Sequence, residues 1–206
     1  MTELERRRHW QEVYAKRAEN EVSWFQERPE TSFDLIARSR VPKTAPVIDI
    51  GAGASRLIDL LLTDGFTDVT VLDIAESALA KARARLGGKA RAVNWIVADI
   101  TAWTPQRRYR LWHDRAVLHF LTAAEDRAAY RKTLIAALEP GGTAIIATFA
   151  LDGPERCSGL PVVRYSGEGL ADELGRDFRL IETVSEDHRT PAGTIQRFQF
   201  SRLQRD

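Results

Sequence analysis

The residues with the clearest chemical potential follow a short apolar segment in the first half of the chain. The segment 47–50 runs into Gly51-Ala52-Gly53, and glycines in such a turn let the backbone approach a bound ligand closely. A helix predicted from Ser55 would direct free N–H groups toward an anionic ligand. Arg56 stands where a dinucleotide fingerprint requires a third small residue, which argues against a nicotinamide or flavin dinucleotide.

Two aspartates end the next two apolar segments. Asp73 lies about twenty residues after the glycine turn, where an acidic side chain can accept hydrogen bonds from both hydroxyls of a ribose. Asp99 ends the following segment. Because open α/β sheets bind ligands at the carboxyl ends of their strands, the three positions together predict a nucleoside site. The alternative is that each aspartate only caps the turn that follows it.

Short segments rich in Val, Ile and Leu alternate with stretches of helical periodicity from Ala45 onward, which predicts an α/β fold with helices on both faces of a parallel sheet. The predicted strands are 46–51, 68–73, 93–98, 110–114 and 143–148, followed by an antiparallel pair at 178–185 and 194–202. The predicted helices are 55–63, 77–86, 123–138 and 168–174. A Pro-Gly-Gly turn at 140–142 introduces the fifth strand.

With these features the sequence resembles the class I S-adenosylmethionine-dependent methyltransferases, and the resemblance covers essentially the whole chain. Asp49-Ile-Gly-Ala-Gly53 matches the first motif of the family, and Pro140-Gly-Gly142 matches its lead-in to strand five. Asp73 matches the residue that binds the ribose, and Asp99 the residue that faces the adenine amino group. Ala54-Ser55 departs from the family by replacing the third glycine of the first motif, a loss that many members tolerate.

The resemblance implies a Rossmann-like sheet of seven strands in the order 3-2-1-4-5-7-6, with only the seventh antiparallel. It implies one domain over 1–206, in which residues 1–44 form a helical lid and residues 45–206 form the core. It also implies S-adenosylmethionine as the cofactor. The expected cofactor-binding residues are Trp10, Tyr14, Trp24, Asp49, Gly51, Ala52, Gly53, Asp73, Ile74, Asp99, Ile100, Asp114 and Ala116. The alternative for the three aromatic residues is that they only pin an extra helix to the core.

The segment after the fourth predicted strand is dense in polar groups, and the family places its first substrate contacts there. Asp114 aligns with the acidic or amide position of that motif, and the backbone near Ala116 would lie beside the methionine part of the cofactor. Arg115 either binds a substrate carboxylate or pairs with Asp114. His119 is either a general base, since an imidazole takes a proton near neutral pH, or a packed histidine. Asp114 and His119 are the candidate catalytic residues.

Three further residues join Arg115 and His119 as candidates for substrate contact. Cys157 lies in the long loop after the fifth strand, where it either contacts a soft substrate or fills a small apolar space. Tyr165 follows that loop, and His188 belongs to the terminal strand pair. The spacing of these side chains fits no zinc pattern, so no metal is expected.

Composition and charge exclude several classes of protein. A single cysteine leaves no internal disulfide. The formal net charge of +1 gives no reason to expect nucleic-acid binding, and the run Arg6-Arg7-Arg8 is interpreted as a solvated helix face. No apolar run approaches the roughly 18 residues of a membrane span, and the charged N-terminus lacks the apolar stretch of a signal peptide. These features predict a soluble, cytoplasmic protein.

The leading hypothesis is in-line methyl transfer to a small molecule, with a thiol or other soft nucleophile favoured as the acceptor. The lack of a basic stripe or an appended recognition domain favours a small acceptor. Protein lysine methylation is the alternative enzymatic function. The non-enzymatic alternative is a binding module that uses the nucleoside pocket as a sensor or scaffold. The oligomeric state stays open.

Overall fold

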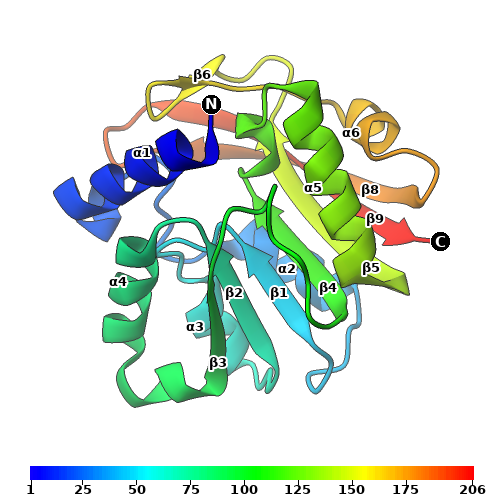
Figure 1. Cartoon of the computed structure of the whole chain (residues 1–206), viewed down its shortest axis with the longest axis horizontal. Helices are drawn as coiled ribbons and strands as arrows, with labels where there is room; N and C mark the ends of the chain where they lie inside the picture. The colour runs from blue at the N-terminus through cyan, green and yellow to red at the C-terminus, as the bar shows by residue number, and fades with distance from the viewer.

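A mixed sheet of seven strands organises the chain, and the computed structural model describes all residues from 1 to 206 (Figure 1). The strands of this sheet are β1 (Val47–Ile50), β2 (Val69–Asp73), β3 (Val93–Val97), β4 (Tyr109–Arg115), β5 (Leu138–Phe149), β8 (Phe178–Arg189) and β9 (Ile195–Arg205). Their order is β3-β2-β1-β4-β5-β9-β8, in which β9 is antiparallel to both neighbours and the other pairs are parallel. In chain order this is 3-2-1-4-5-7-6, so the predicted topology is confirmed.

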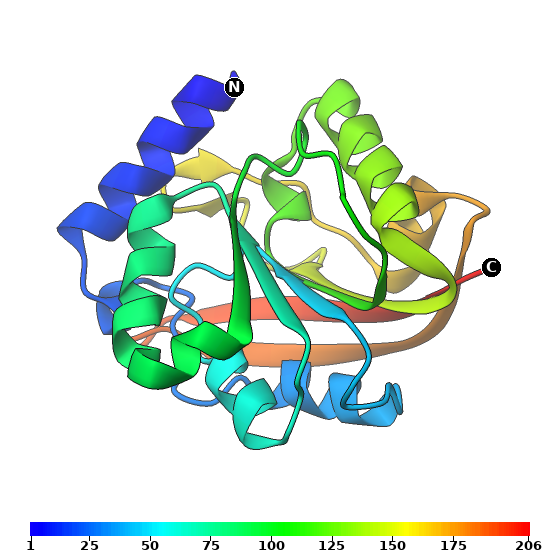
Figure 2. The same ribbon diagram turned by 60° about the horizontal axis from the view of Figure 1, so that its bottom comes forward.

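Helices pack on both faces of the sheet. They are α1 (Glu3–Lys16), α2 (Glu30–Arg38), α3 (Leu57–Thr63), α4 (Glu76–Leu86), α5 (Ala124–Ala137) and α6 (Gly167–Leu174), with short 3-10 turns at Glu19–Glu21, Gly87–Ala92 and Leu118–Phe120. Figure 2 shows α2 and α3 on one side of the sheet and α5 on the other. Neighbouring residues of β1 serve opposite cores, because successive side chains of a strand alternate between faces. Val47 packs in the core that contains Leu57 of α3, and Ile48 packs in the core that contains Tyr130 of α5. None of the helices combines the length and apolar character needed to cross a lipid bilayer.

The fifth strand begins earlier than predicted. β5 starts at Leu138, which pairs with Tyr109 before the register shifts to the pair Leu111–Thr143. Residues 140–142 therefore lie in an irregular part of β5 rather than in a turn before it. The prediction failed because a Pro-Gly-Gly sequence is normally a strand breaker, and only the neighbouring strand shows that pairing continues around it.

The region after β5 also contains more strand than predicted. The loop that follows Phe149 holds a small hairpin of β6 (Arg156–Cys157) and β7 (Leu160–Pro161). The terminal strands stay paired from Phe178–Arg205 to Arg189–Ile195, so both run beyond their predicted ends. Cross-strand pairing extends them through charged positions that weaken the apolar alternation of the sequence.

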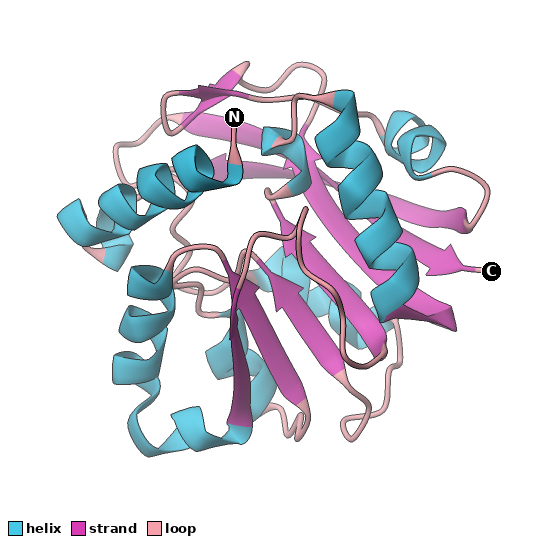
Figure 3. Cartoon of the chain, in the orientation of Figure 1, coloured by secondary structure: helices cyan, strands magenta, loops and turns pink.

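The N-terminal region has two parts. α1 begins with a capping box, in which Thr2 Oγ1 accepts from the Glu5 N–H at 3.3 Å and Glu5 Oε2 accepts from the Thr2 N–H at 2.7 Å. α1 lies beside α4, across the end of the sheet toward which β1 and β2 point (Figures 1 and 3). In contrast, α2 packs into the core through Leu35 and Ile36, which are buried. α1 therefore covers the carboxyl ends of the strands, whereas α2 packs against one face of the sheet.

Candidate active site

A cavity lies at the carboxyl ends of the parallel strands, between the sheet and α1. The space among its lining atoms is about 820 Å³ including its open mouth, and most of the residues that line it are hydrophobic. The predicted site residues that line it are Trp10, Tyr14, Trp24, Gly51, Asp73, Ile74, Asp99, Ile100, Arg115, Ala116 and Cys157. The structure therefore gathers most of the predicted cofactor set around one space.

The glycine turn is packed too closely to admit side chains. Gly51 and Gly53 have φ angles of +62° and +54°, in the left-handed region that favours glycine. A Cβ at Gly51 would overlap Val117, and a Cβ at Gly53 would overlap the hydroxyl of Tyr14. The glycines therefore let Tyr14 of α1 rest directly on the turn.

The N–H groups of residues 51–53 are not free to bind a ligand. The N–H groups of Gly51 and Ala52 donate to the Leu72 carbonyl at 2.7 and 3.2 Å, and the Gly53 N–H donates to Asp73 Oδ2 at 2.8 Å. The turn wraps back on the end of β2, so its donors are used within the protein. In addition, α3 begins at Leu57, two residues later than predicted.

Asp73 lies at the tip of β2 with 5% of its surface exposed. Its Oδ1 accepts from the Ala75 N–H at 2.7 Å, and its Oδ2 accepts from the Gly53 N–H. Burial raises the pKa of Asp73 to about 6, although the two backbone donors act in the opposite direction. Each carboxylate oxygen has a second lone pair, so the side chain can still accept from two ligand hydroxyls.

Asp99 is held by α1 as well as by its own strand end. Its Oδ1 accepts from the Thr101 N–H and hydroxyl at 2.9 and 2.8 Å, and its Oδ2 accepts from Arg6 Nε at 2.8 Å. Arg6 Nη1 also donates to Asp126 Oδ2 at 3.0 Å. The interpretation of Arg6 as part of a solvated face is therefore wrong, because 13% of its side chain is exposed and it pairs with two carboxylates.

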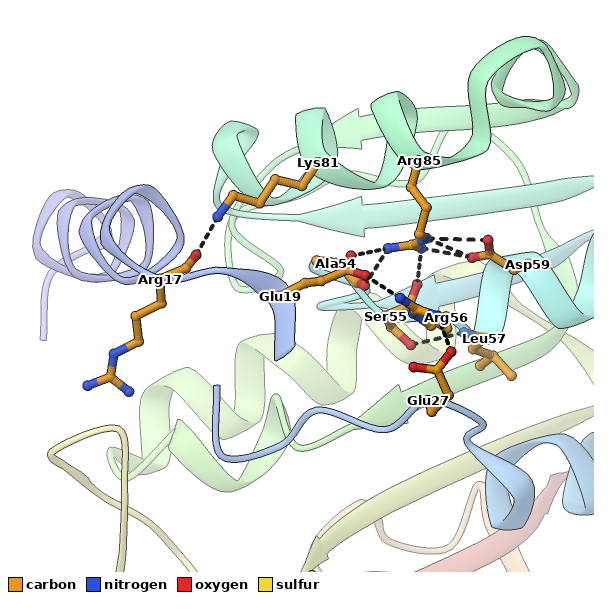
Figure 4. A network of polar contacts seen from close by, with 10 residues as sticks. All are labelled: Arg17, Glu19, Glu27, Ala54, Ser55, Arg56, Leu57, Asp59, Lys81 and Arg85. Atoms are coloured by element: carbon orange, nitrogen blue, oxygen red, sulfur yellow. Dashed lines mark hydrogen bonds and ion pairs between the residues drawn. The ribbon is translucent and has the colours of Figure 1, made fainter. Parts of the chain in front are cut away.

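A second set of ion pairs fastens the chain after α1 to the segment after the glycine turn (Figure 4). Arg85 of α4 donates to the Ala54 and Ser55 carbonyls at 2.8 Å each and pairs with Glu19 at 2.7 Å. Glu19 also pairs with Arg56 at 2.7 Å. Arg56, whose long side chain disfavours a dinucleotide, therefore has a structural role. Together with Arg85 it holds the segment after α1 in place.

Aromatic side chains form one wall of the cavity. Trp10 and Trp24 meet edge to face with ring centroids 5.7 Å apart, and Tyr14 lies 6.1 Å from Trp24. Trp10 also contacts Phe120, with centroids 4.9 Å apart. This wall joins α1 to the segment after β4, so the predicted aromatic residues both line the cavity and attach α1 to the core.

Arg115 ends β4 and points into the cavity rather than toward Asp114. Its Nη1 donates to the Trp24 carbonyl at 3.0 Å, and its Nη2 lies 3.5 Å from Glu186 Oε1. The alternative of an Arg115–Asp114 pair is therefore wrong, because neighbouring residues of a strand point to opposite faces. Cys157 also lines the cavity, and burial raises the pKa of its thiol to about 11.

Asp114 and His119 lie outside the cavity lining. Asp114 Oδ1 accepts from the Val117 N–H at 2.7 Å, and its Oδ2 accepts from the Tyr130 hydroxyl at 2.6 Å. Burial raises the pKa of Asp114 to about 6. His119 packs between Phe120 and Phe149 with no exposed surface, and burial lowers its pKa to about 3. The catalytic role of both residues stays a prediction.

Two of the predicted substrate residues also lie away from the cavity. Tyr165 packs in the core formed with α5 and α6, and its hydroxyl donates to Glu173 Oε2 at 3.3 Å. His188 Nε2 lies 2.7 Å from the Ser23 carbonyl oxygen, outside the cavity lining. Neither side chain lines the cavity with Arg115 and Cys157, although His188 packs against the Phe198 ring that Arg115 also covers.

A buried histidine that the sequence reasoning missed supports the acid of the first motif. His113 Nδ1 lies 2.6 Å from Asp49 Oδ1, and its Nε2 lies 2.9 Å from Ser32 Oγ of α2. Asp49 Oδ2 has no partner and borders a smaller adjoining cavity that Ala52 and Arg115 also line. The only sequence signal was position, since His113 and Arg115 are two residues apart and share a strand face.

No group of three or more His, Cys, Asp or Glu side chains is arranged to hold a metal ion. The residues that surround the cavity instead suit an organic ligand. They combine a carboxylate at Asp73, the backbone of Gly51, which admits no Cβ, and Arg115, whose guanidinium has two buried nitrogen atoms without a hydrogen-bond partner. This set fits a nucleoside that carries a zwitterionic amino-acid tail.

Residues 47–142 match the family model described as a methyltransferase domain. This range contains the glycine turn, Asp73 and Asp99, which surround the cavity. Residues 47–142 therefore carry a methyltransferase domain of the class I, S-adenosylmethionine-dependent kind. The cofactor of this methyltransferase domain is S-adenosylmethionine, and the residues of the cavity fit it.

Comparisons with individual proteins agree with this assignment. A trans-aconitate 2-methyltransferase from Methylobacterium radiotolerans is 38% identical over 120 residues, which are 56% of this chain and 42% of the relative. Among solved structures, one from work on the conversion of a disulfide bond into a thioacetal group in echinomycin biosynthesis has a TM-score of 0.78 at 20% identity, covering 98% of this chain and 93% of that one. The N-methyltransferase NodS from Bradyrhizobium japonicum has a TM-score of 0.71 at 17% identity, covering 96% and 98%.

The comparisons differ in the fraction of each relative that is covered and in sequence identity. The match to the trans-aconitate 2-methyltransferases spans less than half of their length, 42% for the Methylobacterium protein and 47% for one from Azoarcus. At 20% identity and below, the two solved structures show a shared fold of the methyltransferase domain.

Proposed function

We propose that this protein transfers a methyl group from S-adenosylmethionine to a small-molecule acceptor. The proposal rests on one observation, the placement of Asp73, Asp99 and the glycine turn around a single cavity of the methyltransferase domain. In the proposed complex, Asp73 accepts hydrogen bonds from the ribose hydroxyls. Asp99 lies at the adenine end, and Gly51 and Ala116 lie along the methionine part.

The chemistry requires placement more than acid–base assistance. The cofactor supplies a methyl group on a positively charged sulfur, which retains the electron pair of the broken carbon–sulfur bond. An acceptor lone pair forms the new bond from the opposite side of the methyl carbon. Holding two reactants in such a geometry can supply effective molarities of about 10⁵–10⁸ M. The aromatic wall of Trp10, Trp24 and Phe120 contributes by excluding water from this space.

The nature of the acceptor atom follows from what the cavity can deprotonate. A thiolate or carboxylate reacts without further proton loss, whereas an ammonium group must first lose a proton. We include in this proposal the preference for a thiol or other soft nucleophile as the acceptor. The relatives widen the choice, since one is named for trans-aconitate, a carboxylic acid, and another is an N-methyltransferase. Arg115 and Cys157, which both line the cavity, are the residues expected to select among these acceptors.

Isothermal titration with S-adenosylmethionine and S-adenosylhomocysteine tests the cofactor part of the proposal. Folded protein that gives no heat with either compound would end it. Incubation of the protein with radiolabelled S-adenosylmethionine and a cell lysate then tests the acceptor class. Label in the small-molecule fraction supports the proposal, and label only in protein bands supports lysine methylation instead. Tight binding without any labelled product supports a binding module.

A further inference from the structure

Arg115 is a largely buried charged side chain with few hydrogen-bond partners. Only 12% of its side chain is exposed, and its Cζ lies 4.5 Å from the centroid of the Phe198 ring. The Nη1–Trp24 carbonyl hydrogen bond is its only strong polar contact. The nearest carboxylate, Glu186, is 3.5 Å from Nη2 and already accepts from Gln26 Nε2 at 2.9 Å.

The guanidinium therefore has unused hydrogen-bonding capacity. Its Nε and Nη2 are shielded from solvent and donate to no acceptor. A guanidinium carries five N–H donors in a planar fork, and leaving a buried charge partly unpaired is costly. Burial lowers the pKa of Arg115, while the nearby Glu186 acts in the opposite direction. A planar anion that completes the fork would relieve this deficit.

The other charged residues of the cavity are already paired. Arg6 and Asp99 bind each other, and Asp73 accepts from two backbone N–H groups. Arg115 lies among Trp24, Phe198 and Cys157, and it also borders the adjoining cavity that contains the unpartnered Asp49 Oδ2. The N–H groups of residues 51–53 donate to acceptors within the protein, so they are not available to hydrogen-bond an anionic ligand.

We propose that Arg115 is a carboxylate anchor, whose guanidinium group binds a carboxylate in the cavity that it lines. This inference rests on the proposed function, because that function supplies two possible sources of the carboxylate. One is the amino-acid tail of the cofactor, with the free Asp49 oxygen beside it for the ammonium group. The other is a methyl acceptor that is itself a small organic acid. Arg115 is in either case a binding residue rather than an acid or base.

The first experiment asks whether the anchor binds the cofactor. Isothermal titration of the whole protein and its R115Q variant uses S-adenosylhomocysteine and 5′-methylthioadenosine, a similar thioether nucleoside without the amino-acid tail. If the cofactor tail is the source, R115Q weakens S-adenosylhomocysteine binding by about tenfold to about a hundredfold. Its affinity for 5′-methylthioadenosine stays within about twofold of the wild-type value.

The second experiment asks whether the anchor binds an acceptor. Protein saturated with S-adenosylhomocysteine is titrated with succinate, citrate and the uncharged succinamide. If an acceptor acid is the source, the wild type binds an acid in preference to the amide, and R115Q loses that binding by about tenfold or more. The affinity of R115Q for S-adenosylhomocysteine then stays unchanged.

Two further variants separate anchoring from folding. R115K keeps the charge without the fork, so it should remain folded and bind the relevant carboxylate with intermediate affinity. E186Q keeps the guanidinium and removes the competing carboxylate, so its carboxylate affinity should match or exceed that of the wild type. The proposal is overturned if folded R115K and R115Q match the wild type in the first experiment and no acid binds through Arg115 in the second. Failure of the wild type to bind either nucleoside would instead defeat the proposed function.

Discussion

The Nδ1 atom of His113 lies 2.6 Å from Oδ1 of Asp49, and both side chains are buried beneath α2. This contact joins β4 to β1 immediately before the glycine turn. Through Nε2, the same imidazole reaches Ser32 of α2. The acid of the first motif is thereby oriented by a residue from another strand, with one oxygen bound and the other free.

Replacement of His113 by Phe should destabilise the protein more than replacement of Ser32 by Ala. H113F leaves both a buried carboxylate oxygen and a buried hydroxyl without a partner, which costs roughly 1–3 kcal/mol or more. S32A leaves one buried polar atom, Nε2 of His113, without its partner rather than two, so its cost should be smaller, about 1 kcal/mol. Urea unfolding followed by circular dichroism measures both changes. Equal losses for the two variants would show that the His113–Asp49 contact contributes little.

Replacement of Asp73 by Asn should weaken cofactor binding. The amide cannot provide two charged acceptors for the ribose hydroxyls, and hydrogen bonds to a charged group are worth roughly 1.5–3 kcal/mol each. We therefore expect about a tenfold or larger loss of S-adenosylhomocysteine affinity by titration calorimetry. D172N, at an exposed position of α6, is the matched control.

The same experiment at different pH values tests the ionisation of Asp73. Because its pKa in the free protein is raised to about 6, protonation removes the charged acceptor as the pH falls through 6. The wild type should lose affinity between about pH 7.5 and pH 5.5, and D73N should show a flatter profile. Parallel profiles would mean that Asp73 is not the ribose acceptor.

Replacement of His119 by Phe should flatten the acid side of the stability profile. The folded pKa of His119 is about 3 and its ordinary value is 6.5, so between these values the unfolded chain binds a proton that the folded protein does not. This contribution lowers wild-type stability as the pH falls below about 6.5, by about 1.4 kcal/mol per pH unit between about pH 6 and pH 4. Unfolding curves at several pH values should show H119F gaining relative stability toward acid.

H119F also tests the two interpretations of this histidine. The structure favours packing, because the ring lies outside the cavity lining between two phenylalanines. We therefore expect S-adenosylhomocysteine affinity and methyl transfer to be preserved. A fall in turnover at unchanged cofactor affinity would instead support the general base.

Replacement of Arg6 by Gln should loosen α1. The variant removes the part-buried contacts to Asp99 and Asp126, which attach the helix at the Asp99 side of the cavity. Hydrogen exchange measured by mass spectrometry should be faster in residues 3–16, and S-adenosylhomocysteine should dissociate faster. R8Q, which changes an exposed arginine of the same helix, should leave both rates unchanged. Unchanged exchange in R6Q would show that the aromatic contacts alone hold α1.

Local patterns predicted the features that depend on residues close in sequence. The end of β2 at Asp73 was correctly placed because it follows a short apolar run, and the same signal placed the end of β3 within two residues of Asp99. The glycine turn was placed by the strand before it. The α/β class followed from the alternation of strands and helices, and the sheet order followed from the family resemblance. These signals need no knowledge of which side chains meet.

The features that were not predicted depend on contacts between residues that are distant in the sequence. His113 contacts Asp49 only because β1 and β4 are neighbours in this register, and Arg6 meets Asp99 across 93 residues of chain. Asp114 follows the family motif, but its side chain points away from the cavity toward Tyr130. A pattern of residue types does not specify such partners, so it can name a polar residue without revealing which way that residue points.

Trp10 and Phe198, near opposite ends of the chain, face the same cavity. The pocket consequently exists only after the last strand and the first helix have both docked, which makes ligand affinity a measure of complete folding rather than of sheet formation. A polypeptide stopped before β9 lacks Phe198, and one released from α1 by a protease lacks Trp10, so neither can form the complete cavity.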